Sequence, residues 1–190
     1  MSSTYSGPPG TLPDIAVVVV TYNSAHVVGD LLDSLPAALE GLTADVVVVD
    51  NGSSDGTAEM MEALGACHVV RSANVGYAGG INRGVREAAS ARAILVLNPD
   101  VRLHPGSLPP LLTALREPGV GIVAPRVLTP QGELYLSLRR EPTLPRALGL
   151  TRTRLAVFSE YVYGSAAYTR PCTVDWALGA ALLIDRKSVV

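Results

Sequence analysis

The chain has 190 residues, of which 48% are hydrophobic, 17% charged and 5% aromatic, and its formal net charge is −2. This length suits one domain, and the apolar content supplies a sizeable core and excludes disorder over most of the chain. The lack of a basic excess argues against a nucleic-acid partner. No apolar run reaches the roughly 18 residues of a transmembrane segment, and residues 1–13 are typical of a flexible leader.

The first half of the chain alternates two kinds of segment. Short apolar runs rich in β-branched residues favour strands buried on both faces, and they occupy 15–20, 46–49, 68–70 and 94–97. Helical spacing of apolar residues occurs between and after these runs, at 27–35, 56–64, 78–89 and 108–116. We expect Pro36 to bend or end the first helix and Ser107 to cap the fourth. The order β-α-β-α-β-α-β-α predicts an α/β fold with a doubly wound sheet.

The second half is less regular. Residues 120–128 and 133–139 have strand character and are joined by turn residues at 129–132. Residues 141–173 predict a loop-rich insertion with room for one short helix, and 174–184 return to an apolar, strand-like pattern. The sequence therefore predicts a regular front part and an irregular insertion.

Two cysteines, Cys67 and Cys172, lie far apart and outside any C-x-x-C pattern. We favour two reduced thiols in a cytoplasmic protein over a disulfide. The three histidines are scattered, which argues against a metal site built from histidine.

Polar residues follow each of the four expected strands. In an open α/β sheet, ligands bind at the carboxyl ends of the strands. Here those ends are followed by small polar residues, glycines and carboxylates, at 21–24, 50–57, 74–82 and 98–100. Each segment alone is consistent with ordinary turn chemistry. Four such segments on one edge of a sheet favour a ligand site at that edge.

The chemistry of these segments indicates a nucleotide. Asp50 can accept hydrogen bonds from a nucleobase imide or a ribose hydroxyl, or alternatively cap a helix that starts near Ser54. The helix beginning at Ala78 would favour a phosphate at its N-terminus. Three glycines would allow backbone to pass close to a ligand: Gly76, Gly79 and Gly80. Their spacing is neither the G-x-G-x-x-G dinucleotide fingerprint nor a P-loop, which disfavours a nicotinamide oxidoreductase.

Asn98-Pro99-Asp100 ends the fourth strand with an oxygen-bearing side chain on each side of the proline. A hard divalent ion carried by a diphosphate needs few protein ligands, because phosphate oxygens and water supply the others. One carboxylate is enough to begin such a site, although Asn-Pro-Asp is also a common turn sequence.

Together the strand ends resemble the glycosyltransferases of family 2, and most closely their bacterial rhamnosyltransferase-like branch. The resemblance covers about residues 14–186. The sequence runs that carry it are VVVVTYNS, VVVVDNGSSDGT, NVGYAGGINRG, LVLNPDV and DWALGAALLI. It implies the GT-A fold, a doubly wound, mostly parallel sheet flanked by helices, in a family domain at 14–190.

The resemblance also implies roles for individual residues. Those expected around the donor nucleotide are Thr21, Tyr22, Asn23, Asp50, Asn51, Ser53, Asp55, Asn74, Gly76, Tyr77, Gly79 and Asn98. Asp100 would bind Mg²⁺ or Mn²⁺, and Asn98 stands where the D-x-D motif of the family has its first Asp. Trp176, Gly179 and Ala180 would line the acceptor and sugar side, with a core aromatic as the alternative for Trp176.

The implied reaction transfers a sugar, with inversion, from a dTDP-rhamnose-like or UDP-sugar donor. The acceptor would be a polysaccharide or a polyprenyl-linked glycan in cell wall biosynthesis, handled in the cytoplasm or at the inner face of the membrane. The family's catalytic base lies in an acidic motif expected beyond Val190, so we expect the chain to be truncated and to carry no catalytic residue. The alternative is a non-catalytic nucleotide-sugar-binding module.

Overall fold

The computed structural model describes residues 11–88, 90–147 and 155–188. They divide into two compact units. The sheet unit runs to Val123 and resumes at Gly179, and the insert unit comprises Ala124–Leu178. Most of the expected leader at 1–13, and Val190, lie outside the described residues. The single family domain expected over 14–190 stays a prediction.

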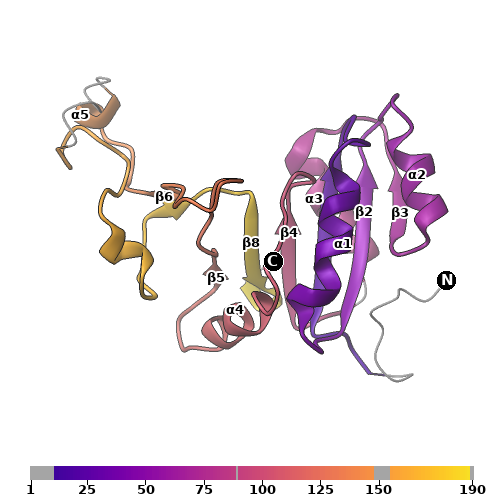
Figure 1. The fold of residues 1–190 in the computed structure, drawn as a ribbon, viewed down its shortest axis with the longest axis horizontal. Helices are drawn as coiled ribbons and strands as arrows, with labels where there is room; N and C mark the ends of the chain where they lie inside the picture. Colours follow the sequence, from indigo (N-terminus) through magenta and orange to yellow (C-terminus); the bar gives the residue numbers. More distant parts are fainter. Residues whose placement is uncertain (1–10, 89, 148–154, 189–190) are drawn as a thin grey trace. The chain divides into compact units, whose positions relative to one another are not determined.

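The sheet unit is built on a six-stranded sheet of order β3-β2-β1-β4-β8-β5 (Figure 1). Its strands are β1 (Ile15–Thr21), β2 (Ala44–Asp50), β3 (His68–Arg71), β4 (Ala93–Leu97), β5 (Ile122–Val123) and β8 (Ala181–Asp185). The first four are parallel, and β8 pairs antiparallel with β4 and β5. Strand order reverses between β1 and β4, the position at which doubly wound sheets bind ligands.

Helices cover both faces of this sheet. They are α1 (Val28–Leu39), α2 (Thr57–Leu64), α3 (Gly76–Glu87) and α4 (Leu108–Leu115). Because side chains alternate along β1, Ile15, Val17 and Val19 face a core shared with α1 and α4, whereas Val18 packs near Val85 of α3. Figure 1 shows α1 and α3 on opposite sides of the sheet. The predicted α/β fold is confirmed.

Two glycines of α3 allow the helix to approach the sheet closely. A Cβ at Gly80 would lie 2.7 Å from Val20 Cγ1, and one at Gly84 would lie 2.4 Å from Val18 Cγ1. Both glycines are buried. The expectation that Gly80 serves a ligand is therefore wrong, because helix packing requires its missing side chain.

Two helix boundaries and one helix cap differ from the expectation. α1 continues past Pro36 to Leu39, because burial of Ala38 and Leu39 offsets the hydrogen bond that proline cannot make. α3 begins two residues before Ala78. Ser107 occupies the N-cap position of α4, but its hydroxyl makes no capping bond and is buried without a partner in the described structure.

The insert unit contains little regular structure. Its elements are β6 (Leu138–Arg139), α5 (Leu144–Ala147), the 3₁₀ helix η2 (Ser165–Tyr168) and β7 (Trp176–Ala177). The turn at 129–132 is confirmed, since Gly132 N donates to Thr129 O. The long strands expected around this turn are wrong, because only Ile122–Val123 and Leu138–Arg139 form strands there, and beside the turn Leu128 and Leu134 form just an isolated antiparallel bridge. Residues 174–184 likewise form two strands, one in each unit.

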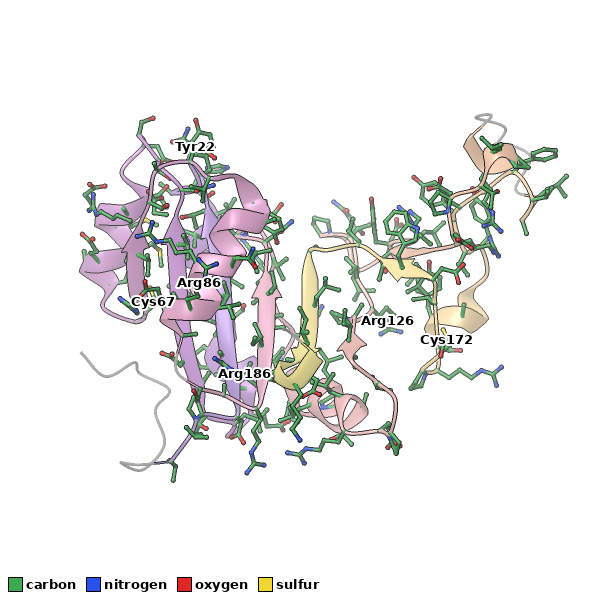
Figure 2. The ribbon with its side chains drawn as sticks, turned by 180° about the vertical axis from the view of Figure 1, so that it is seen from behind. Tyr22, Cys67, Arg86, Arg126, Cys172 and Arg186 are labelled. Atoms are coloured by element: carbon green, nitrogen blue, oxygen red, sulfur yellow. The ribbon has the colours of Figure 1, made fainter. Side chains whose placement is uncertain are left out.

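No helix in the described part of the chain is long and apolar enough to cross a membrane. Both cysteines are free, which agrees with the expected thiols; Cys67 lies in the sheet unit and Cys172 in the insert unit (Figure 2). Burial raises the pKa of the Cys67 thiol to about 11.

Candidate functional site

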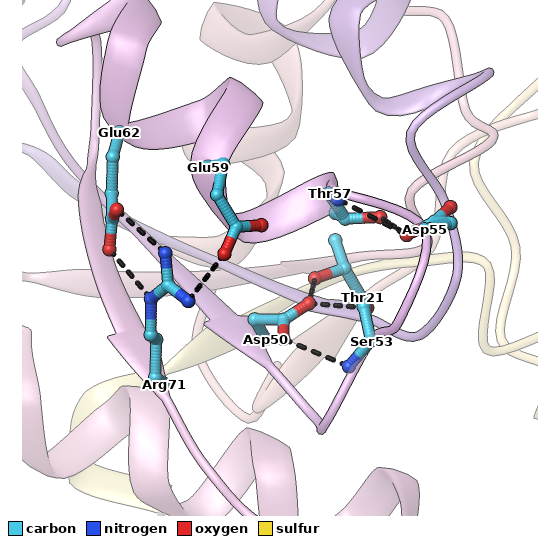
Figure 3. A network of polar contacts seen from close by, with 8 residues as sticks. All are labelled: Thr21, Asp50, Ser53, Asp55, Thr57, Glu59, Glu62 and Arg71. Atoms are coloured by element: carbon cyan, nitrogen blue, oxygen red, sulfur yellow. Dashed lines mark hydrogen bonds and ion pairs between the residues drawn. The ribbon is translucent and has the colours of Figure 1, made fainter.

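The loop after β2 is organised around the Asp50 carboxylate (Figure 3). One carboxylate oxygen accepts hydrogen bonds from Ser53 Oγ at 2.5 Å and Thr21 Oγ1 at 3.1 Å, and the other accepts from Ser53 N at 3.0 Å. Asp50 is only 4% exposed. A carboxylate offers about four acceptor positions, so roughly one remains for a ligand at the mouth of the loop. Asp50 does not cap α2, and the capping alternative is wrong.

Asp55, which precedes the N-cap residue Gly56, bonds to the first residue of α2 instead. Its Oδ1 accepts hydrogen bonds from the Thr57 hydroxyl at 2.5 Å and the Thr57 amide at 3.1 Å, while Oδ2 accepts from Ala25 N at 3.1 Å. The Thr57 hydroxyl is the main reason that the pKa of Asp55 lies below its usual value. Asp55 thus starts α2 and ties it to the loop after β1.

Asn23 completes the link between the first two loops. Its backbone has φ 50°, in the left-handed region that Asn tolerates better than most residues. Its amide N–H donates to Ser53 Oγ at 2.9 Å, and its side-chain oxygen accepts from Ser54 N at 2.8 Å. The neighbouring Tyr22 is 56% exposed and projects from the end of the sheet unit (Figure 2).

Two asparagines join the second loop to the start of α3. Asn51 donates from Nδ2 to Asn74 Oδ1 at 3.1 Å and accepts from Val75 N at 3.0 Å. Asn74 Oδ1 also accepts from Gly76 N at 3.0 Å, and Gly76 has φ 77°, which favours glycine. The N-cap residue Val75 offers no side-chain cap, so the amides of the first turn after Gly76 remain suited to an anion.

Tyr77 extends this network to the end of β4. Its hydroxyl donates to Asn98 Oδ1 at 2.8 Å, and Asn98 N donates to Ala180 O at 2.9 Å. Burial, and secondarily the negative charge of Asp100, raise the pKa of Tyr77 above its ordinary value of 10. The hydroxyl therefore stays protonated, and the Tyr77–Asn98 bond persists across the neutral pH range.

Asp100 is the exposed carboxylate nearest in sequence to this junction. The described residues contain no group of three or more His, Cys, Asp or Glu able to hold a metal ion by themselves. Asn98 Oδ1 keeps one lone pair free after accepting from Tyr77. These two oxygens fit a divalent ion that arrives with a diphosphate, since such an ion needs few protein ligands.

Hydrogen bonds therefore connect the loops after β1, β2, β3 and β4 in succession. Of the twelve residues predicted around a nucleotide, Thr21 and Asp50 end β1 and β2, and the others lie in these loops or in the first turn of α3. Ala180 joins them through Asn98, and Gly179 precedes it in the sheet unit. Trp176 lies in the insert unit and is 41% exposed, so the core-aromatic alternative is wrong.

Sequence reasoning missed Thr57, which is fully buried and whose hydroxyl accepts from Ser24 N at 2.9 Å. The signal was present, because Asp-Gly-Thr before a helical pattern is a capping sequence. Outside the network, Arg71 of β3 pairs with Glu59 and Glu62 of α2 at 2.7 and 2.8 Å (Figure 3). These pairs are solvent-exposed and contribute little stability.

The sequence of this chain is similar to those of known glycosyltransferases. An N-acetylglucosaminyl-diphospho-decaprenol L-rhamnosyltransferase of Mycobacterium tuberculosis is 31% identical over 195 positions, covering 92% of this chain and 62% of that enzyme. A dolichyl-phosphate hexose transferase of Haloferax volcanii is 30% identical over 186 positions, covering 92% and 77%. This chain therefore spans less than two thirds of the rhamnosyltransferase's length.

Among solved structures, the mannosyltransferase PcManGT from Pyrobaculum calidifontis, in complex with GDP-Man and Mn²⁺, matches with a TM-score of 0.55 and 25% identity. The match covers 69% of this chain and 40% of that one. The sequence profile described as "Glycosyl transferase family 2" matches residues 16–171. The chain belongs to glycosyltransferase family 2 and has its GT-A fold.

Proposed function

We propose that this chain binds the nucleotide-sugar donor of an inverting glycosyltransferase. The observation that carries the proposal is the hydrogen-bonded succession of four strand-end loops from Thr21 to Asn98. Residues that only stabilise the turn in which they lie would form hydrogen bonds within that loop. Here the side chains also form hydrogen bonds with the neighbouring loop. A preorganised rim of this kind holds a ligand with little ordering cost.

The nucleoside would lie against the loops after β1 and β2. Asp50 has an acceptor position left for an imide or ribose hydroxyl, and the exposed Tyr22 ring offers an apolar surface to the base. Asn23, Asn51, Ser53 and Asp55 hold these loops in place. Their hydrogen bonds to backbone amides support a positioning role beside any direct contact.

The diphosphate would lie between the first turn of α3 and Asp100. The N-terminal amides of α3 suit an anion, and the missing side chain of Gly79 lets the Val75 side chain pack against this turn, since a Cβ there would lie 2.9 Å from Val75 Cγ2. Asp100, with the Asn98 oxygen, would hold Mg²⁺ or Mn²⁺. When bound, the ion would neutralise charge on the departing nucleoside diphosphate. The Mn²⁺ in the PcManGT complex supports this assignment.

The acceptor is proposed to be a polysaccharide or a polyprenyl-linked glycan. The names of both relatives contain a polyprenyl carrier, decaprenol or dolichol. We also propose that the donor is a dTDP-rhamnose-like sugar nucleotide or a UDP-sugar. The proposed role is in cell wall polysaccharide synthesis, in the cytoplasm at the inner face of the membrane. Trp176, Gly179 and Ala180 are proposed to line the acceptor and sugar side.

A thermal-shift screen tests the proposal directly, because ligands that bind the folded state raise the unfolding temperature. dTDP, UDP, GDP and NAD are compared with and without Mn²⁺. We expect a rise with at least one pyrimidine nucleoside diphosphate, larger with Mn²⁺, and none with NAD. Stabilisation by NAD without response to the nucleoside diphosphates would overturn the proposal. Binding without sugar turnover in the presence of a lipid-linked acceptor would favour a non-catalytic module.

A further inference from the structure

A second cluster of functional side chains lies wholly within the insert unit. Arg139 of β6 pairs with Trp176 of β7 on one side and forms a bridge with Tyr161 on the other. Residues directly opposite in neighbouring strands point to the same face. The Arg139 guanidinium accordingly lies 3.8 Å from the centre of the Tyr161 ring and 5.8 Å from that of Trp176.

Arg139 is a buried cation without an anionic partner. It is 8% exposed, and no carboxylate of the described residues lies within ion-pair distance of it. Its Nη1 donates to the backbone oxygens of Leu136 and Leu138, whereas Nε and Nη2 have no partner in the described part of the chain. Burying a charge is costly unless it is paired. Two carbonyls and two aromatic rings surround the guanidinium, and Nε and Nη2 remain for a ligand.

A second polar group near Arg139 also lacks a partner. Ser137 is 2% exposed, and among the described side chains its hydroxyl is one of the buried groups without a hydrogen bond. Ser137 O accepts from Leu178 N, which extends the pairing of β6 with β7 by one residue. Alternation along the strand then puts Ser137 on the same face as Arg139.

We propose that Arg139 recognises the phosphate of the acceptor, and that the partly exposed rings of Tyr161 and Trp176 receive the sugar next to that phosphate. The two carbonyls and the two rings fix the guanidinium, so its remaining N–H groups form a preset fork that matches phosphate oxygens. Tyr161 and Trp176 are 37% and 41% exposed and offer apolar surface to a sugar ring. The inference rests on the proposed function, because a lipid-linked acceptor carries a sugar beside a phosphate.

The chain supplies its own reporter for this site. Trp176 is the only tryptophan in the sequence, so its fluorescence reports on the surroundings of Arg139. The probes are inorganic pyrophosphate, a sugar 1-diphosphate on a short alkyl chain, and dTDP. The last probe distinguishes acceptor phosphate from donor phosphate. Binding of dTDP at the sheet unit is followed separately by calorimetry.

The variants are Arg139→Gln, which removes the charge, and Arg139→Lys, which keeps the charge but loses the fork. Arg170→Gln, at an exposed position of the same unit, is the matched control. We expect the dissociation constant of the sugar diphosphate to rise at least about tenfold in Arg139→Gln, less in Arg139→Lys, and less than twofold in Arg170→Gln. Calorimetric dTDP binding should change less than twofold in all three.

A second measurement uses the unsubstituted chain, so that its result does not depend on whether the variants fold. It asks whether a bound ligand protects Arg139 from chemical modification. Pyrophosphate should slow modification of Arg139 by phenylglyoxal, measured by mass spectrometry, while Arg170 reacts at an unchanged rate. Unprotected Arg139, or unchanged sugar-diphosphate affinity in a folded Arg139→Gln, would overturn the inference. Loss of only the dTDP response in that variant would assign Arg139 to the donor and overturn it too. Failure of dTDP binding everywhere would instead count against the proposed function.

Discussion

At the residue scale, Asp50 shows how one carboxylate can shape a ligand loop before any ligand arrives. Three hydrogen bonds fix its two oxygens, and Asp50 is only 4% exposed. Hydrogen bonds to a charged group contribute more than neutral ones, and an orphaned buried donor is costly. The conformation of the loop after β2 therefore depends on this side chain.

Asp50→Asn should destabilise the fold by about 1–3 kcal/mol, because the amide cannot accept at its nitrogen and one Ser53 donor is left unpaired. Urea unfolding measures the change, and calorimetry should find weaker nucleoside diphosphate binding as well. Asp33→Asn, on the exposed face of α1, is the control and should stay within about 0.5 kcal/mol. Equal effects of the two substitutions would show that Asp50 does not organise the loop.

Asp100→Ala should leave the unfolding free energy nearly unchanged, since the Asp100 side chain is exposed. It should weaken the Mn²⁺-dependent part of nucleoside diphosphate binding at least about tenfold, because the ion loses its one carboxylate. Calorimetry with and without Mn²⁺ separates the two contributions. A metal dependence that survives the substitution would remove Asp100 from the ligands.

At the element scale, α3 combines two demands on one helix. Its first turn presents amides at the rim, and its buried side lies so close to β1 that side chains are absent at two positions. Gly80 and Gly84 meet Val20 and Val18 directly. The helix thus carries destabilising glycines in order to bring its N-terminus into place.

Gly84→Ala should destabilise the protein by about 1–3 kcal/mol, because the new methyl group overlaps Val18 and forces the helix from the sheet. Gly29→Ala, in α1, is the matched control: nothing lies within 4 Å of the added Cβ, and the change should stabilise by about 0.5–1 kcal/mol. Denaturant titration measures both. Effects of the same sign would contradict the proposed close packing.

Elements with a strong local signal could be predicted from the sequence. The apolar runs at 15–20 and 94–97 are short and rich in β-branched residues, which favours a buried strand. Residues 120–139 form strands only where a segment distant in sequence pairs with them. α1 passes Pro36 because tertiary burial outweighs a local preference. Local pattern therefore predicted the sheet unit well and the insert unit poorly.

At the scale of the whole molecule, the part of the candidate site in the sheet unit could be predicted from the sequence, and the part in the insert unit could not. The strand-end loops could be predicted because parallel strands end at one edge of their sheet, and their residues proved to be hydrogen-bonded from loop to loop. Arg139 could not be predicted, because its pairing with Trp176 and Tyr161 joins segments far apart in an irregular region. That Arg139 is buried and has no carboxylate partner among the described residues can be learned only from the three-dimensional structure.

The proposed function requires that four separate loops form one binding site for a nucleoside diphosphate. An NMR titration of backbone amides with dTDP or UDP and Mg²⁺ tests it most directly, since each loop reports separately. We expect concerted shifts, with one dissociation constant, in the segments 21–24, 51–55, 74–79 and 98–100. Shifts confined to one of these loops, or centred on α4 and the far end of the sheet, would show that the four loops do not form one site.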